Sequence, residues 1–207
     1  MQTSISFSKS DQKLRQRVLT WLENNVSQSR IDHIVRVEEM AIALAEHHGV
    51  SVQKAAQAGL MHDLAKFFKP KRLLEHARAD GLEVDAVFEA NPHLLHATVG
   101  AIIARDEFGV GDRDILDAIA NHTLGCPGMN SLSCIVFLSD SLEPGRGDTE
   151  ELNTLRQLSF QDLDQAVWMT CDYTIRYLLE AKKLIHPRAI ATRNWFLQSA
   201  KNRTVIK

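Results

Sequence analysis

The sequence contains few cysteines and no long apolar run. Its three cysteines, Cys126, Cys134 and Cys171, form no C-x-x-C pair and are odd in number, which excludes a disulfide framework and a cysteine-based zinc module. No apolar run approaches the roughly 18 residues that a membrane-spanning helix needs. Met1–Ser10 has one lysine and lacks the apolar segment of a signal peptide. We therefore expect a cytoplasmic protein that does not bind a membrane.

An excess of charge of either sign is also missing. The 24 Lys and Arg against 26 Asp and Glu leave a formal net charge of −2, with nine His counted as neutral. A protein without a basic excess lacks the broad positive surface of nucleic-acid-binding proteins, so we expect no nucleic-acid partner. An anionic partner would have to be bound locally. The nine histidines are of interest because imidazole is the commonest metal ligand and changes charge near neutral pH.

The spacing of apolar residues is helical almost throughout the chain. They recur at three- and four-residue intervals rather than alternately, which is typical of amphipathic helices. Ser10 or Asp11 is expected to cap the first helix, and Pro70 to open a later one. Gly and Pro clusters predict loops at 125–128 and 143–149. The sequence therefore predicts an all-α protein of about nine or ten helices, folded as a single domain over residues 1–207.

Six histidine and aspartate side chains lie on five predicted helices, with His62 and Asp63 adjacent, and most of them are near a helix end: His33, His62, Asp63, His96, His122 and Asp140. They can converge only if a bundle brings several helices together. A mixed set of imidazole and carboxylate donors suits Fe, Mn, Zn or Co better than Ca²⁺. Each histidine taken alone is more often a surface residue or a satisfied core residue than a ligand.

Four ordered blocks of sequence contain most of these residues: GLMHDLAK at 59–66, HATVGA at 96–101, NHTLGCPGM at 121–129 and SDSLEPGR at 139–146. The order His33, His62-Asp63, Asp140 resembles the H…HD…D signature of HD-domain metal-dependent phosphohydrolases. The longer blocks resemble the YqeK-type HD proteins, which are bacterial symmetrical diadenosine tetraphosphate hydrolases. The similarity covers about residues 16–185 and leaves a C-terminal helix after it. It implies an HD-type helical bundle.

The resemblance implies a dinuclear centre of divalent metal. One metal would be held by His33, His62, Asp63 and Asp140. Asp63 would also bridge to a second metal, completed by His96 and His122, and so take part in catalysis. Iron is expected first, with Mn, Co or Zn as alternatives. Two neighbouring cations can lower the pKa of a shared water and polarise the phosphoryl group that it attacks.

Five further residues are predicted to contact the substrate: Arg30, Lys66, Thr123, Gly125 and Arg146. Lys66 is also assigned a catalytic role, because a cation one turn beyond the ligands can meet negative charge that develops on phosphate. The guanidinium forks of Arg30 and Arg146 suit phosphate. The Thr123 hydroxyl and the Gly125 N–H could meet phosphate or ribose. A solvated lysine, surface arginines and ordinary turn chemistry are the alternatives.

The loop after Asp140 contains one expected support and one difference from the family. Glu143 could orient a metal ligand or an arginine from behind. After EPGR the family pattern continues with phenylalanine, proline and glycine, whereas this chain has Gly147-Asp148-Thr149. The difference concerns the nucleotide-facing edge of the site and leaves the predicted metal ligands unchanged.

The resemblance predicts a hydrolase that cleaves diadenosine tetraphosphate, a dinucleoside polyphosphate, into two ADP. Two alternatives are open at this point: an HD phosphohydrolase that acts on another nucleotide or an alarmone, and a non-catalytic nucleotide-binding module. Trp168 and Trp195 could stack on a base, although their helical spacing favours the core. The sequence is also compatible with a homodimer.

Overall fold

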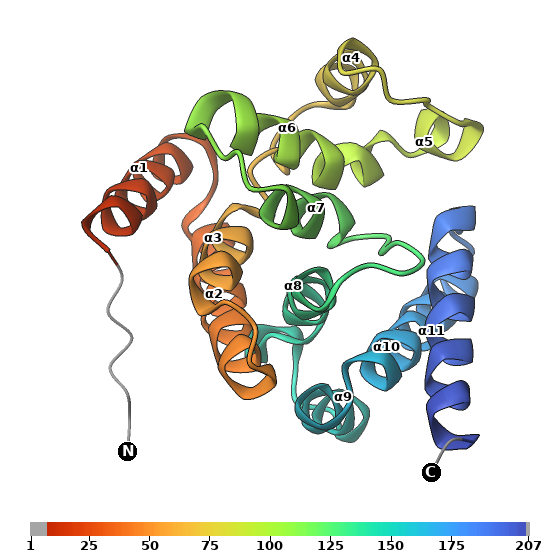
Figure 1. The fold of residues 1–207 in the computed structure, drawn as a ribbon. Helices are drawn as coiled ribbons and strands as arrows, with labels where there is room; N and C mark the ends of the chain where they lie inside the picture. Colours follow the sequence, from red (N-terminus) through yellow and green to blue (C-terminus); the bar gives the residue numbers. More distant parts are fainter. Residues whose placement is uncertain (1–7, 206–207) are drawn as a thin grey trace.

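The computed structural model describes residues 8–205, which form a bundle of helices (Figure 1). The α-helices in chain order are α1 (Lys9–Asn25), α2 (Gln28–His48), α3 (Val52–Met61), α4 (Pro70–Ala79), α5 (Ala86–Ala90), α6 (His96–Phe108), α7 (Arg113–Asn121), α8 (Ser131–Leu142), α9 (Glu150–Gln161), α10 (Leu163–Glu180) and α11 (Pro187–Val205). Two 3₁₀ helices, η1 (Pro92–Leu95) and η2 (Pro144–Arg146), precede α6 and follow α8. The prediction that the chain has no signal peptide concerns Met1–Ser10, of which residues 1–7 lie outside the described residues.

The all-α prediction is confirmed, since no strand occurs between residues 8 and 205. The eleven α-helices of residues 8–205 exceed the expected nine or ten because α5 was not foreseen. This helix has five residues and is capped by Asp85, whose side chain accepts hydrogen bonds from the N–H groups of Val87 and Phe88. Five residues are too few to show a helical period.

The first helix begins earlier than predicted. Ser8 caps α1, and the expectation that Ser10 or Asp11 does so is wrong. Ser8 and Asp11 instead form a reciprocal capping box, in which the Asp11 N–H donates to Ser8 Oγ and the Ser8 N–H donates to Asp11 Oδ2. Pro70 opens α4 as predicted. The predicted loop at 125–128 is confirmed, and that at 143–149 contains η2.

Helix α8 lies in the middle of the bundle, with α2, α3, α7, α9 and α10 packed around it (Figure 1). Nine of its twelve residues are buried, which is typical of a helix surrounded by other helices. Helices α2 and α3 are in close contact at Gly59. A Cβ at Gly59 would lie 3.0 Å from the Cα of Glu38 and 3.3 Å from the Cβ of Ala41. The small residue therefore brings the end of α3 close to α2.

Helices α10 and α11 pack against each other on one side of the bundle (Figure 1). Side chains of α11 hold the loop after α7: Arg188 donates to the carbonyl oxygens of Gly125 and Ala120, and Thr192 donates to that of Leu124. The C-terminal helix is therefore bound to the rest of the fold through backbone carbonyls. None of the described helices is long and apolar enough to cross a membrane.

The two tryptophans differ in their surroundings. Trp168 is partly buried against the core, as expected. Trp195 is 40% exposed, so the expectation that it belongs to the core is wrong. The adjacent Phe196 is fully buried instead, because it occupies the inner face of α11.

Candidate metal centre

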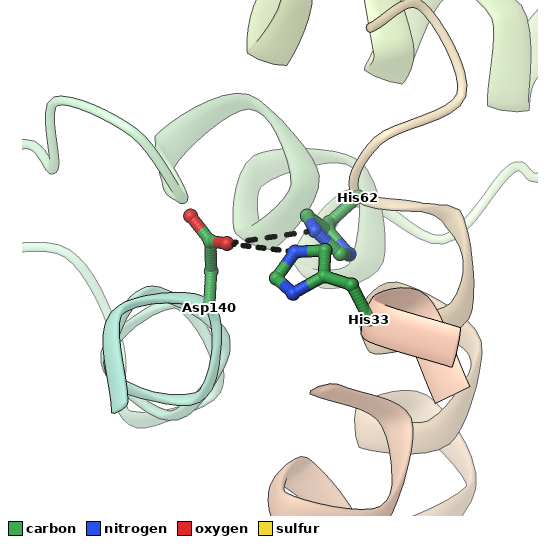
Figure 2. A group of neighbouring side chains, drawn as sticks. All are labelled: His33, His62 and Asp140. Atoms are coloured by element: carbon green, nitrogen blue, oxygen red, sulfur yellow. Dashed lines mark ion pairs between the residues drawn. The ribbon is translucent and has the colours of Figure 1, made fainter. Parts of the chain in front are cut away.

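Three predicted ligands from three helices meet beside α8 (Figure 2). His33 lies on α2, His62 caps the C-terminus of α3 and Asp140 lies on α8. Asp140 Oδ1 is 3.2 Å from His33 Nε2 and 3.7 Å from His62 Nε2. Because His62 ends its helix, the next residue can face the same space. These three side chains are close enough to share one cation.

The other three predicted ligands form an adjoining group around Asp63, in the turn after α3. His96 begins α6, and His122 caps the C-terminus of α7. Asp63 Oδ1 is 3.3 Å from His96 Nε2 and 3.8 Å from His122 Nε2. Asp63 Oδ2 is 3.6 Å from His62 Nε2 and 4.0 Å from His33 Nε2. The two oxygens of one carboxylate thus face two groups of histidines.

All four histidines present Nε2 to this space because a fixed acceptor faces Nδ1. His62 Nδ1 is 2.7 Å from Gly59 O, and His122 Nδ1 is 2.7 Å from Ile119 O. His96 Nδ1 lies against the carbonyl of the residue three positions earlier in the same way. A carbonyl oxygen can only accept, so Nδ1 carries the proton and the Nε2 lone pair is available to a metal.

The donor set has the properties that a divalent cation requires. His33 Nε2, His62 Nε2 and Asp63 Oδ1 are buried and have no hydrogen-bond partner, an arrangement that costs about 1–3 kcal/mol for each polar group left unpaired. His96 Nε2 and His122 Nε2 lie 3.0 Å apart, close enough for both to reach one cation. These buried oxygen and nitrogen donors fit a divalent transition metal.

Burial and neighbouring charge set the protonation states that ligands need. Burial lowers the pKa of His62 and lowers the pKa of His122 to about 3, so both imidazoles are neutral. Burial also opposes ionisation of Asp63, but His62, His96 and Lys66 outweigh it and hold the pKa well below its usual range. Asp140 shows the same balance, with the neighbouring His33 side chain foremost in lowering its pKa against burial. His62 and His122 are therefore neutral imidazoles beside the ionised carboxylates of Asp63 and Asp140.

Glu143 supports the centre from behind His33, as the sequence suggested. It is 1% exposed, and its Oε1 accepts a hydrogen bond from His33 Nδ1 at 3.0 Å. Burial tends to raise the pKa of Glu143, but hydrogen bonds from Arg36 and His33 lower it to about 2. Arg36 was not singled out from the sequence. Its position one turn after His33 on α2 was the signal that could have found it.

Three predicted substrate-binding cations border the centre. Arg30 NH1 lies 3.0 Å from Asp63 Oδ2, and Arg146 NH2 lies 2.5 Å from Asp140 Oδ1. Lys66 Nζ is 3.1 Å from His96 Nε2. The three side chains are 34%, 40% and 37% exposed, in the order named. Each cation therefore contacts a predicted ligand on one side and solvent on the other.

The predicted residues on the turn after His122 differ from each other. Thr123 Oγ1 lies 3.2 Å from His96 Nε2, at the edge of the centre. Gly125 lies against α11, where a Cβ would be 2.4 Å from Thr192 Cγ2. Its N–H already donates to Asn121 O. The N–H that was expected to bind phosphate therefore already has an acceptor within the chain. The close approach of Thr192 favours a packing role for Gly125.

A cavity of about 380 Å³ adjoins the centre. His122, Asp140 and Arg146 line it on the side of the centre. Much of the remaining wall comes from α10, α11 and their connection, including Tyr173, Leu178, Leu184 and Ala189. A cavity of this size is typical of a small-molecule site. The sequence analysis missed this wall, because apolar residues at helical spacing also fit an ordinary core.

An all-α bundle with histidines and aspartates gathered at its helix ends is the architecture of metal-dependent HD hydrolases. The chain matches the HD domain family over residues 30–145. It also resembles the structure of a predicted HD superfamily hydrolase involved in NAD metabolism from Clostridium acetobutylicum. That likeness has a TM-score of 0.85 and 32% identity, and covers 89% of this chain and 97% of the other.

Two curated proteins are similar over most of their length. The chain is 34% identical over 186 residues to "Bis(5'-nucleosyl)-tetraphosphatase, symmetrical" of Bacillus subtilis, covering 90% of this chain and 99% of that protein. It is 35% identical over 187 residues to the protein of the same name from Halalkalibacterium halodurans, with the same coverage. The chain therefore belongs to the HD domain family, in the branch of the symmetrical bis(5'-nucleosyl)-tetraphosphatases.

Proposed function

We propose that this chain hydrolyses diadenosine tetraphosphate symmetrically to two ADP. The observation that carries the proposal is Asp63, whose two oxygens face two groups of histidines beside three partly exposed cations. The similarity to proteins named symmetrical bis(5'-nucleosyl)-tetraphosphatase supports this substrate. The adjoining cavity supports it too, because it offers space beside the centre for one end of such a molecule.

We further propose a dinuclear centre. His33, His62, Asp63 and Asp140 would hold one divalent cation, and Asp63, His96 and His122 the other. Iron is our first expectation, with Mn, Co or Zn as alternatives, because the donors are mixed imidazole and carboxylate. Two such cations, when bound, supply a water of lowered pKa and polarise the phosphoryl oxygen.

The side chains around the centre would bind and orient the polyphosphate. Arg30, Lys66 and Arg146 would donate hydrogen bonds to phosphate oxygens from their exposed sides, and Lys66 would meet charge that develops in the reaction. Thr123 would contribute a hydroxyl at the same edge. A nucleoside seated in the cavity beside Arg146 would set how far the phosphate chain extends across the centre. Symmetrical cleavage requires attack at the second phosphate from one end, so this depth decides the products.

Product analysis tests the proposal. The purified chain, loaded in turn with Fe²⁺, Mn²⁺, Co²⁺ or Zn²⁺, would be incubated with diadenosine tetraphosphate and the products separated by chromatography. We expect ADP alone. ATP together with AMP would contradict symmetrical cleavage. Turnover of another nucleotide or an alarmone but not of this substrate would favour a different HD phosphohydrolase, and binding without turnover would favour a non-catalytic module.

We also infer that residues 1–207 act as one hydrolase domain, since α10 and α11 lie beyond the HD match yet wall the cavity beside the centre. A cytoplasmic location, the absence of a nucleic-acid partner and a homodimer stay predictions. Gel filtration coupled to light scattering would measure the oligomeric state.

A further inference from the structure

Helix α2 contributes one residue to each of two similar arginine–glutamate pairs, which lie in different parts of the molecule. Arg15 of α1 binds Glu38 of α2, and Arg36 of α2 binds Glu143 after α8. Both carboxylates are buried, at 4% and 1% exposure. The first pair joins two helices away from the metal centre. The second pair ends at His33 and therefore reaches the centre.

The Glu143 carboxylate accepts hydrogen bonds from Arg36, Gly145 and His33. Arg36 Nε donates to Oε2 at 2.5 Å, and Arg36 NH2 lies 3.4 Å from Oε1. The N–H of Gly145 donates to Oε2, and His33 Nδ1 donates to Oε1. The arginine thus supplies the positive charge that a buried carboxylate needs and fixes the plane of that carboxylate.

His33 differs from the other three histidines in the kind of acceptor that faces its Nδ1. His62, His96 and His122 each direct Nδ1 to a carbonyl three residues earlier in the chain. Those acceptors belong to the same local stretch of backbone. The acceptor for His33 is a side chain 110 residues away in sequence. The orientation of the His33 ring therefore depends on the position of the Glu143 side chain.

Arg36 also packs on the turn that follows Glu143. A Cβ at Gly145 would lie 2.4 Å from Arg36 NH2 and 2.7 Å from Nε, so the guanidinium rests directly on the glycine backbone. The next residue, Arg146, reaches back to Asp140, a second predicted ligand of the same metal. One arginine outside the centre therefore contacts the supports of two of its ligands.

We propose that Arg36 is a positioning residue of the metal centre. It holds Glu143, which directs the Nδ1–H of His33 and leaves Nε2 for the metal, and it fixes the turn from which Arg146 reaches Asp140. The inference rests on the proposed metal site. It assigns Arg36 no contact with the substrate or the reacting atoms.

Metal affinity, measured without substrate, tests the inference. The metal-stripped full chain and its variants would be titrated with Co²⁺ by calorimetry, and the visible spectrum of bound cobalt would report the ligand geometry. We expect Arg36→Gln to weaken cobalt binding about 10- to 100-fold, as loss of a group behind a metal ligand commonly does, and to change the spectrum. Arg36→Lys keeps the charge but loses the planar fork, so we expect an intermediate affinity.

Arg15→Gln is the matched control, because it also removes an arginine from a buried glutamate of α2. We expect it to lower the unfolding temperature and to leave cobalt affinity and spectrum unchanged. Wild-type cobalt affinity in Arg36→Gln would overturn the inference, as would equal losses of affinity in both variants, which would indicate a general effect of stability. Intact cobalt binding without hydrolysis in the wild-type chain would refute the proposed function alone. Absence of cobalt binding in the wild-type chain would overturn the metal site and this inference together.

Discussion

The metal centre and the cavity beside it are built from different parts of the chain. All six proposed ligands lie between residues 30 and 145, the segment that matches the HD domain. Much of the wall of the cavity comes from α10 and α11, beyond that segment. The centre consists of buried charged and imidazole groups, whereas this wall offers mainly apolar side chains. The segment that matches the family thus supplies the proposed metal ligands, while helices outside it shape the cavity proposed for the substrate.

The two regions are nevertheless joined mechanically. Arg188 and Thr192 of α11 hold the backbone carbonyls of the loop that follows His122. Movement of the cavity wall would therefore be transmitted to the turn that carries a proposed ligand. Variants that separate metal binding, substrate binding and stability can test how far the regions act independently.

Asp63→Ala is expected to have the largest effect, on the centre itself. Asp63 faces both groups of histidines, so its loss should abolish metal retention and lower hydrolysis by about 10³-fold or more, since the metals supply several kcal/mol to the reaction. Metal content by mass spectrometry and turnover of diadenosine tetraphosphate would measure this. Circular dichroism should show largely unchanged helical content.

Asp32→Ala serves as the control, because Asp32 is an exposed neighbour of His33 on α2. It should keep both metal and activity. Full activity of Asp63→Ala would contradict the bridging assignment and would move the catalytic role to the remaining ligands.

Ala189→Trp should act on the cavity and leave the centre intact. Ala189 lines the cavity from α11, and a large ring there would occupy space proposed for the nucleoside. We expect KM to rise about tenfold, equivalent to about 1.4 kcal/mol, with metal content and kcat nearly unchanged. Steady-state kinetics would measure both constants. The same change at the exposed Ala191 of α11 should alter neither, and an unchanged KM in Ala189→Trp would mean that substrate binds elsewhere.

Thr149→Ala is expected to have the smallest effect. The Thr149 hydroxyl caps α9 by accepting a hydrogen bond from the N–H of Leu152, and loss of such a cap costs about 1 kcal/mol. Urea unfolding should show this loss, and Thr149→Ser should restore the cap. KM and kcat should stay unchanged. A raised KM would show instead that the loop Gly147-Asp148-Thr149 contacts the substrate.

The helical pattern and the blocks around His62-Asp63 predicted the fold class and the residues that gather at the centre. The positions of these residues near helix ends were informative, because a side chain at a C-cap can face a neighbouring helix, as those of His62 and His122 do. Helix α5 was missed because five residues show no period. The sequence does not show that the N–H of Gly125, which is predicted to contact the substrate, donates to Asn121 O.

The sequence alone determined which side chains are able to hold a metal and that helices would carry them, because apolar spacing and residue type are local properties. The tertiary structure decided what lies behind and beside those side chains. Arg36 and Glu143 are 107 residues apart in sequence, and the cavity joins Asp140 to helices that follow it. Such contacts depend on how the helices pack, and no local sequence pattern contains the resulting burial and distances. Only the tertiary structure therefore distinguishes Arg36, which contacts Glu143 behind His33, from Arg15, which contacts Glu38.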